Sequence, residues 1–241
     1  MLSRNEVKYI QSLYHKKNRN TEDVFIAEGV KIINEILNSD YKIKKIYALN
    51  EWIIENNKYE NIVEVTEDEL KRISDFETPN KVLAVIYKKP AKEIPDLKNQ
   101  ITLVLDGIQD PGNVGTIIRT ANWFGIKNII ASNDTADIYN PKVIKASMGS
   151  FTSIDIFYTE LKSFLASNSI YVYGAIIDGE NINAMQKLNE CLLVIGNEGN
   201  GIRNDIYPFI QKKISIPKFG NAESLNAAVA TGIILWKLKE K

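Results

Sequence analysis

The stretch Ile214-Ser-Ile-Pro-Lys-Phe-Gly-Asn-Ala-Glu-Ser-Leu-Asn-Ala-Ala-Val-Ala-Thr-Gly-Ile233 reads as a strand end, a polar loop and the start of a helix. Pro217 cannot extend a strand ladder, and Gly220-Asn221 is typical of a tight turn. We therefore expect a helix that begins near Glu223 or Ser224. Its core-facing stripe is predicted from apolar residues at intervals of three and four: Leu225, Ala228, Val229, Gly232, Ile233 and Trp236.

The predicted first turn of this helix carries Ser224 and Asn226. Free backbone N–H groups and the positive end of the helix dipole favour an anionic or oxygen-rich ligand there. The alternative is ordinary helix capping, because serine and asparagine are common at helix starts. Taken alone, this segment favours the cap.

A second segment, residues 103–125, also predicts a strand, a loop and a helix. Its glycine spacing matches neither the dinucleotide fingerprint nor the P-loop, which argues against a Rossmann cofactor and an NTPase. Asn113 and Arg119 lie six residues apart, less than two helical turns, so the guanidinium is predicted to reach back toward the loop. A solvated arginine on the helix surface is the alternative.

A third segment, residues 191–202, is an apolar run typical of a buried parallel strand, and it ends in a glycine-rich loop. Glycines allow a ligand to approach the backbone closely. Glu198 lies between glycines and has no hydrophobic role, which makes it a candidate for the site. A solvated glutamate on a surface loop explains the same pattern.

Together the three segments resemble, in order and in residue detail, the three motifs of the SpoU/TrmH family of RNA ribose 2′-O-methyltransferases in the SPOUT class. Asn113 and Arg119 match the first motif, residues 196–199 the second, and Ser224 with Asn226 the third. The resemblance runs from about Ile101 to the C-terminus. It implies a parallel sheet with a deep trefoil knot.

The residues themselves support an α/β class, because strands alternate with helical stretches. In such folds, ligands bind beyond the carboxyl ends of the strands, and all three motifs lie at such ends. The predicted strands are Ile101–Leu105, Asn128–Ala131, Tyr171–Ile176, Cys191–Ile195 and Lys213–Ile216.

The resemblance also implies S-adenosylmethionine as the methyl donor, a homodimer that completes the site, and no metal. The family's favoured general base corresponds to Arg119, but a guanidinium is a poor proton acceptor, so we expect it to act as an electrostatic clamp. The implied catalytic residues are Asn113, Arg119, Glu198, Ser224 and Asn226. The implied cofactor-binding residues are Gly174, Ala175, Gly196, Asn197, Ile216, Pro217 and Leu225.

The sequence predicts an N-terminal RNA substrate-binding domain over residues 1–89, a linker over 90–100 and a methyltransferase domain over 101–241. Prolines among charged residues argue for the linker. The pattern Phe25-Ile-Ala-Glu-Gly29 before a helix resembles the ribosomal-protein-like domain of the family's ribosomal RNA branch. Ribosomal RNA, most readily 23S, is therefore the expected substrate; transfer RNA is the alternative within the family.

Thirty basic and thirty acidic residues give zero formal net charge, so RNA binding depends on local patches. One histidine and one cysteine leave a metal site without ligands, and Cys191 is expected to be buried. Without a signal peptide or a long apolar segment, a cytoplasmic, membrane-free protein is expected. A catalytically silent, ribosome-associated RNA binder is the remaining alternative. The predicted RNA-binding residues are Arg4, Lys8, Lys16, Lys17 and Arg19.

Overall fold

The computed structural model describes residues 2–76 and 78–240, and their contacts divide the chain into two compact units. The first unit takes residues 1–91 together with 139–152, and the second takes residues 92–138 and 153–241. Each unit has its own sheet and its own hydrophobic core. No helix in the described part of the chain is long and apolar enough to cross a membrane.

The first unit is built on a four-stranded mixed sheet with the strand order β1-β4-β2-β3. Strand β4 is antiparallel to both β1 and β2, whereas β2 and β3 are parallel. The strands are β1 (Val24–Glu28), β2 (Ile43–Ala48), β3 (Ile62–Glu64) and β4 (Val82–Tyr87). The helices are α1 (Arg4–Ser12), α2 (Lys16–Glu22), α3 (Val30–Leu37), α4 (Asn50–Glu55), α5 (Glu67–Ile73) and α7 (Pro141–Ser147).

Helix α7 belongs to the first unit although it lies late in the sequence. It packs against β1, and the aromatic residues on either side of it close around Phe25. The ring centroid of Phe25 lies 4.8 Å from that of Tyr139 and 5.8 Å from that of Phe151. These aromatic contacts attach the segment to the sheet of the first unit.

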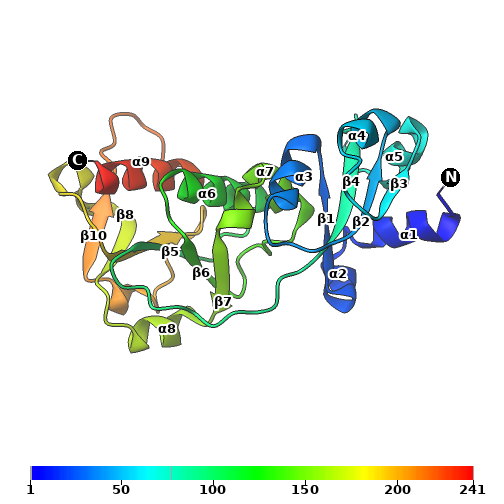
Figure 1. The fold of residues 1–241 in the computed structure, drawn as a ribbon. Coiled ribbons are helices and arrows are strands. Elements are labelled where there is room, and N and C mark those ends of the chain that lie inside the picture. Colours follow the sequence, from blue (N-terminus) through cyan, green and yellow to red (C-terminus); the bar gives the residue numbers. More distant parts are fainter. Residues whose placement is uncertain (1, 77, 241) are drawn as a thin grey trace. The chain divides into compact units, whose positions relative to one another are not determined.

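The second unit is an α/β fold around a six-stranded, wholly parallel sheet with the order β10-β8-β9-β5-β6-β7. The predicted α/β class and parallel sheet are confirmed, and five of the six strands were predicted. Helices α6 and α9 lie along one side of this sheet and α8 along the other (Figure 1). The deep trefoil knot remains a prediction. The strands are β5 (Ile101–Asp106), β6 (Asn128–Ser132), β7 (Asp155–Thr159), β8 (Val172–Asn181), β9 (Cys191–Gly196) and β10 (Lys212–Ser215). The helices are α6 (Pro111–Trp123), α8 (Leu161–Ser167) and α9 (Ala227–Lys239), and the chain's short 3-10 turns are η1 (Ser150–Ser153), η2 (Ile182–Ala184) and η3 (Tyr207–Phe209).

Two predictions about the C-terminal helix are wrong. Helix α9 begins at Ala227, later than the predicted start near Glu223 or Ser224. The predicted core stripe lies largely on the outer face, where Val229, Ile233 and Trp236 are 51%, 39% and 62% exposed. Because α9 is apolar all round, periodicity does not identify the side that packs on the sheet. The buried side is formed by Ala227, Ala228, Thr231, Ile234, Leu235 and Leu238.

Candidate active site at the carboxyl edge of the parallel sheet

Strands β10, β8, β9 and β5 are neighbours in the parallel sheet, so their carboxyl ends meet at one edge. The loops after β5, β9 and β10 carry the three motifs. Strand β8 leaves β9 after Gly174, and its pairing with β10 jumps from Gly174 to Glu180 at this point. Gly174 and Ala175 therefore lie where β8 departs from the central sheet, beside the ends of β9 and β10.

Three residues from the three motifs form one hydrogen-bonded chain. The Asn226 Nδ2 donates to Asn113 Oδ1 at 2.8 Å, and Asn113 Nδ2 donates to Glu198 Oε1 at 2.5 Å. These residues are 113 and 85 positions apart in sequence, so only the fold brings them together. The other carboxylate oxygen of Glu198 has no hydrogen-bond partner among the described residues.

The cap of helix α9 fixes one end of this chain. Asn226 is the N-cap, and its Oδ1 accepts hydrogen bonds from the backbone N–H groups of Ala228 and Val229. The capping interpretation of Asn226 is therefore confirmed, while its role in a catalytic site stays a prediction. The amide uses its oxygen for the cap and its nitrogen for Asn113. Helix α6 is capped in the same way by Asp110, whose Oδ1 accepts from the Asn113 N–H at 2.7 Å.

The loop after β9 is held tightly by Asn197. Its Nδ2 donates to the Gly107 carbonyl at 2.8 Å, and its Oδ1 accepts from the N–H groups of Gly199 and Asn200. Backbone hydrogen bonds of 3.0 and 2.9 Å between Asn197 and Gly201 close the loop. Only glycine fits at position 196, because an added Cβ would lie 2.3 Å from backbone atoms of Gly201 and Ile202.

Asp106 and Arg203 anchor the same loop, and the sequence analysis did not identify them. Asp106 is fully buried at the end of β5 and accepts from the Arg203 N–H at 2.8 Å and Nε at 2.6 Å. Partial burial lowers the pKa of Arg203, but its hydrogen bond to Asp106 and the charges of Asp106 and Asp134 outweigh this effect and raise it. A carboxylate that ends a largely apolar strand was the available signal, because such a group needs a cationic partner when buried.

Arg119 and Ser224 do not join the network within one chain. Arg119 is exposed and shares the outer face of α6 with Thr116 and Trp123, at spacings of three and four. Ser224 is exposed and lies two residues before Asn226, the N-cap of α9. Neither side chain has a hydrogen bond or ion pair to another residue that the structure describes.

The loop between β10 and α9 suits a ligand bound through the backbone. Backbone groups of residues 217–225 make no hydrogen bond to other described residues, so their N–H groups and carbonyls are available. Ile216 and Pro217 are half-buried at its start, and Leu225 is 49% exposed at its end. Apolar side chains beside free backbone groups fit an adenosine moiety, so these residues are compatible with S-adenosylmethionine.

The predicted RNA-binding set needs one correction. Arg19 is only 2% exposed, and its Nη1 donates to the carbonyls of Leu13 and Tyr14 at 3.2 and 2.9 Å. It is a structural residue that joins α2 to the end of α1, and its guanidinium is not available to RNA. The four other members of the set are exposed on α1 and α2: Arg4, Lys8, Lys16 and Lys17.

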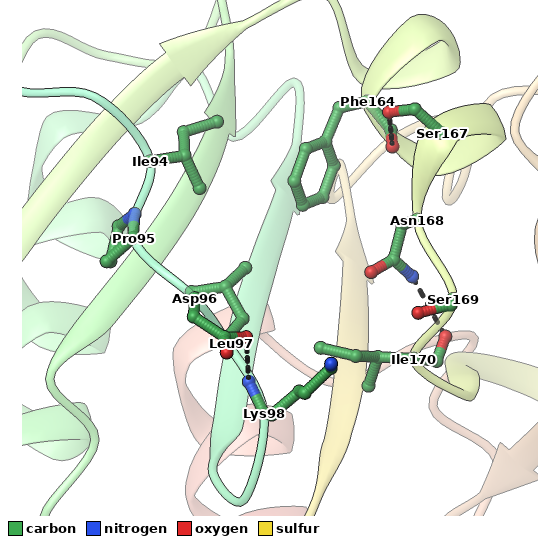
Figure 2. A pocket seen from close by; sticks show the side chains of 10 residues that line it. All are labelled: Ile94, Pro95, Asp96, Leu97, Lys98, Phe164, Ser167, Asn168, Ser169 and Ile170. Atoms are coloured by element: carbon green, nitrogen blue, oxygen red, sulfur yellow. Dashed lines mark hydrogen bonds between the residues drawn. The ribbon is translucent and has the colours of Figure 1, made fainter.

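Two surface cavities lie outside the motifs. One of about 220 Å³ is lined by the segment before β5 and the turn between α8 and β8, including Leu97, Phe164 and Ile170 (Figure 2). Another of about 240 Å³ lies in the first unit between β1 and α7. Neither contains a motif residue. Within residues 2–76 and 78–240, no cluster of histidine, cysteine or carboxylate side chains is arranged to hold a metal ion.

Comparison with known proteins agrees with this geometry. The model of the SpoU rRNA Methylase family matches residues 100–236, and that of the MRM3-like substrate binding domain matches residues 4–84. The chain belongs to the SpoU methylase family, with a substrate-binding domain of the MRM3-like type.

Relatives with similar sequence or structure extend over almost the whole chain. The 23S rRNA (guanosine(2553)-2′-O)-methyltransferase RlmP of Bacillus subtilis is 30% identical and aligns over 97% of this chain and 96% of its own. An AdoMet-bound rRNA methyltransferase from Sinorhizobium meliloti superposes with a TM-score of 0.88 at 28% identity, covering 99% and 96% of the two chains. The SpoU methyltransferase AviRb of Streptomyces viridochromogenes, in complex with AdoMet, gives 0.85 at 25% identity, covering 98% and 97%.

Proposed function

We propose that this protein transfers a methyl group from S-adenosylmethionine to a ribose 2′-hydroxyl in 23S ribosomal RNA. The observation that carries the proposal is the hydrogen-bonded chain Asn226–Asn113–Glu198, which joins all three motifs at the carboxyl edge of the sheet. RlmP of Bacillus subtilis, which aligns over 97% of this chain, is named a 23S rRNA methyltransferase, and residues 4–84 match a substrate-binding domain. Action on ribosomal RNA would place the protein in the cytoplasm.

S-adenosylmethionine supplies an electrophilic methyl group on a sulfonium centre. Ile216, Pro217 and Leu225 would hold its adenosine part, together with Gly174, Ala175, Gly196 and Asn197. The tight packing at Gly196 and the Asn197 hydrogen bonds keep the loop after β9 in one shape. A rigid loop matters because in-line methyl transfer depends on positioning of the nucleophile.

The residues of the network position the ribose. Asn113 is fixed by its two neighbours, and Glu198 keeps one carboxylate oxygen free to accept a hydrogen bond from an RNA hydroxyl or a guanidinium. Ser224, exposed beside the network, would contact the ribose. Arg119 would stabilise the forming alkoxide and an adjacent phosphate as an electrostatic clamp, while the proton leaves to water or to a phosphate oxygen.

A homodimer explains why Arg119 points outward. Trp123 on α6 is 86% exposed, and the outer stripe of α9 is apolar. Helices α6 and α9 pack against each other, and a Cβ added at Gly232 of α9 would lie 3.6 Å from Thr120 Cγ2 of α6. Trp123 and the outer stripe of α9 therefore belong to neighbouring helices. If two copies pair through the outer sides of α6 and α9, Trp123 and the apolar stripe of α9 become buried, and Arg119 is brought to the partner's site.

Sedimentation measures the assembly directly. We expect a dimer for the unsubstituted protein and a monomer for Trp236→Glu, because a charge at the most exposed residue of the α9 stripe opposes burial of that stripe. Ile54→Glu places the same charge on an isoleucine of α4 that is 68% exposed, and we expect this control to leave the dimer intact. If the unsubstituted protein sediments as a monomer at all concentrations, the proposed dimer is wrong.

Calorimetry with S-adenosylmethionine and transfer of a labelled methyl group to ribosomal RNA from a deletion strain test the activity. Mapping 2′-O-methyl marks in that RNA identifies the nucleotide. Arg119→Lys is expected to lose most transfer while it still binds the methyl donor, because lysine lacks the planar fork that contacts two oxygens at once. Full activity of this variant would exclude the clamp, and absence of methyl-donor binding by the unsubstituted protein would exclude the enzyme.

A further inference from the structure

Phe219 is the most exposed large hydrophobic side chain among the described residues, at 97%. It lies on the loop between β10 and α9, flanked by Pro217 and Gly220. We propose that Phe219 is a stacking platform for a nucleobase of the RNA substrate and that Lys218 contacts the adjacent phosphate. This inference rests on the proposed function, and it adds RNA-binding residues outside the predicted set.

The position of Phe219 distinguishes it from a scattered surface residue. Single exposed apolar residues are common on proteins. Phe219, however, follows the end of β10 at Ser215 by four residues and precedes the network residue Asn226 by seven. The loop that carries it is the one whose backbone groups are free at residues 217–225. An aromatic ring on this loop is therefore presented at the edge of the sheet where the ribose would bind.

The chemistry of the neighbouring residues favours RNA as the occupant. Lys218 is exposed and has no ion pair with another residue of the described ranges. An aromatic ring beside an unpaired cation is the combination that binds single-stranded nucleic acid, because every base has a face that stacks and every nucleotide has a phosphate. A hydrophobic protein partner would gain little from an unpaired lysine next to the ring.

The exposure of Phe219 makes a clean substitution series available, because its side chain contributes nothing to the core. Phe219→Ala should lower kcat/KM for methyl transfer to ribosomal RNA by about 5- to 150-fold, the range for loss of one base–aromatic stack. Phe219→Leu keeps an apolar side chain without a flat π face and should lose nearly as much, whereas Phe219→Trp should retain or increase activity. Lys218→Gln should weaken RNA binding and reduce its salt dependence.

Three measurements on the same proteins separate this role from the others. S-adenosylmethionine affinity, melting temperature and sedimentation should be unchanged in Phe219→Ala, because the ring is 97% exposed and the stacking role gives it a contact with RNA alone. Wild-type kcat/KM for Phe219→Ala or Phe219→Leu, or a dimer that dissociates on either change, would overturn the stacking role. If the unsubstituted enzyme fails to methylate the RNA, the proposed function fails, and this inference fails with it.

Discussion

Gly196→Ala tests whether the loop after β9 is as closely packed as the structure indicates. An added Cβ would lie 2.3 Å from Gly201 C and from Ile202 N. Nonbonded carbon atoms approach to about 3.5 Å, so one backbone segment must move by roughly 1.2 Å. The atoms in conflict are backbone atoms, and no side-chain rotation relieves the overlap.

That movement works against the two hydrogen bonds between Asn197 and Gly201. Overpacking in a closely packed region costs about 1–3 kcal/mol, a range that already includes the backbone shifts that would weaken these hydrogen bonds. We therefore expect Gly196→Ala to lower the free energy of unfolding by about 1–3 kcal/mol if the loop yields partly. For a chain of this size that corresponds to a melting temperature roughly 2–12 °C lower.

The assay is thermal unfolding followed by calorimetry with S-adenosylmethionine. The matched control is Gly220→Ala, which adds the same methyl group where no atom lies within 4 Å of the new Cβ. We expect the control to melt like the unsubstituted protein and Gly196→Ala to bind the methyl donor more than tenfold more weakly. Equal melting temperatures and equal donor affinity in Gly196→Ala would refute the packing argument.

Three further predictions concern stability and reactivity. Burial raises the pKa of the Cys191 thiol to about 12, so the native protein at pH 8 should not react with a disulfide reagent until it is unfolded. The hydrogen bond from Lys45 lowers the pKa of Glu6 below 4.5, so its contribution is present at neutral pH and is lost as the pH falls through the folded-state pKa. Glu6→Gln should then lower the free energy of unfolding by about 0.2–1 kcal/mol at pH 7, with chemical denaturation curves that converge toward the unsubstituted protein at acidic pH. Gly232→Ala, in the interior of α9 with only an ordinary contact of 3.6 Å, should raise the free energy of unfolding by up to about 1 kcal/mol, which differential scanning calorimetry detects.

The sequence predicts the fold well where local pattern and tertiary packing agree. The buried strands β5 and β9 are continuous apolar runs, and the structure has them within one residue of their predicted ends. Strand β7 was not predicted because its alternation is weak and four of its five residues are only half-buried. Helix α2 is polar on most of its surface and was not predicted either, since its buried arginine gives no apolar periodicity.

The site was predictable in part for a different reason. Asn113 and Asn226 stand at helix starts and Glu198 in a turn, where packing does not require a polar side chain, so their chemistry was visible in the sequence. Asp106 is paired with Arg203 across 97 positions, and the only local signal is the place of Asp106 at the end of a buried strand, which does not identify its partner. The outer face of α9 was misassigned because the helix is apolar all round, so composition does not distinguish the side that packs on the sheet from the exposed side.

The cap of α9 determines which side chains donate and which accept hydrogen bonds in the network Asn226–Asn113–Glu198. Because Asn226 Oδ1 accepts from two helix N–H groups, its Nδ2 must face Asn113, and an amide turned the other way would leave those N–H groups without their cap. Asn113 then presents its oxygen to Asn226 and its nitrogen to Glu198, so Glu198 is the acceptor at the end of the chain. An ionised carboxylate suits that position, since it accepts on both oxygens and needs no proton. The folding requirement of one helix end thus orients a carboxylate 28 positions earlier in the chain, and it leaves one carboxylate oxygen free for the donor that the proposed function requires, an RNA hydroxyl or a guanidinium.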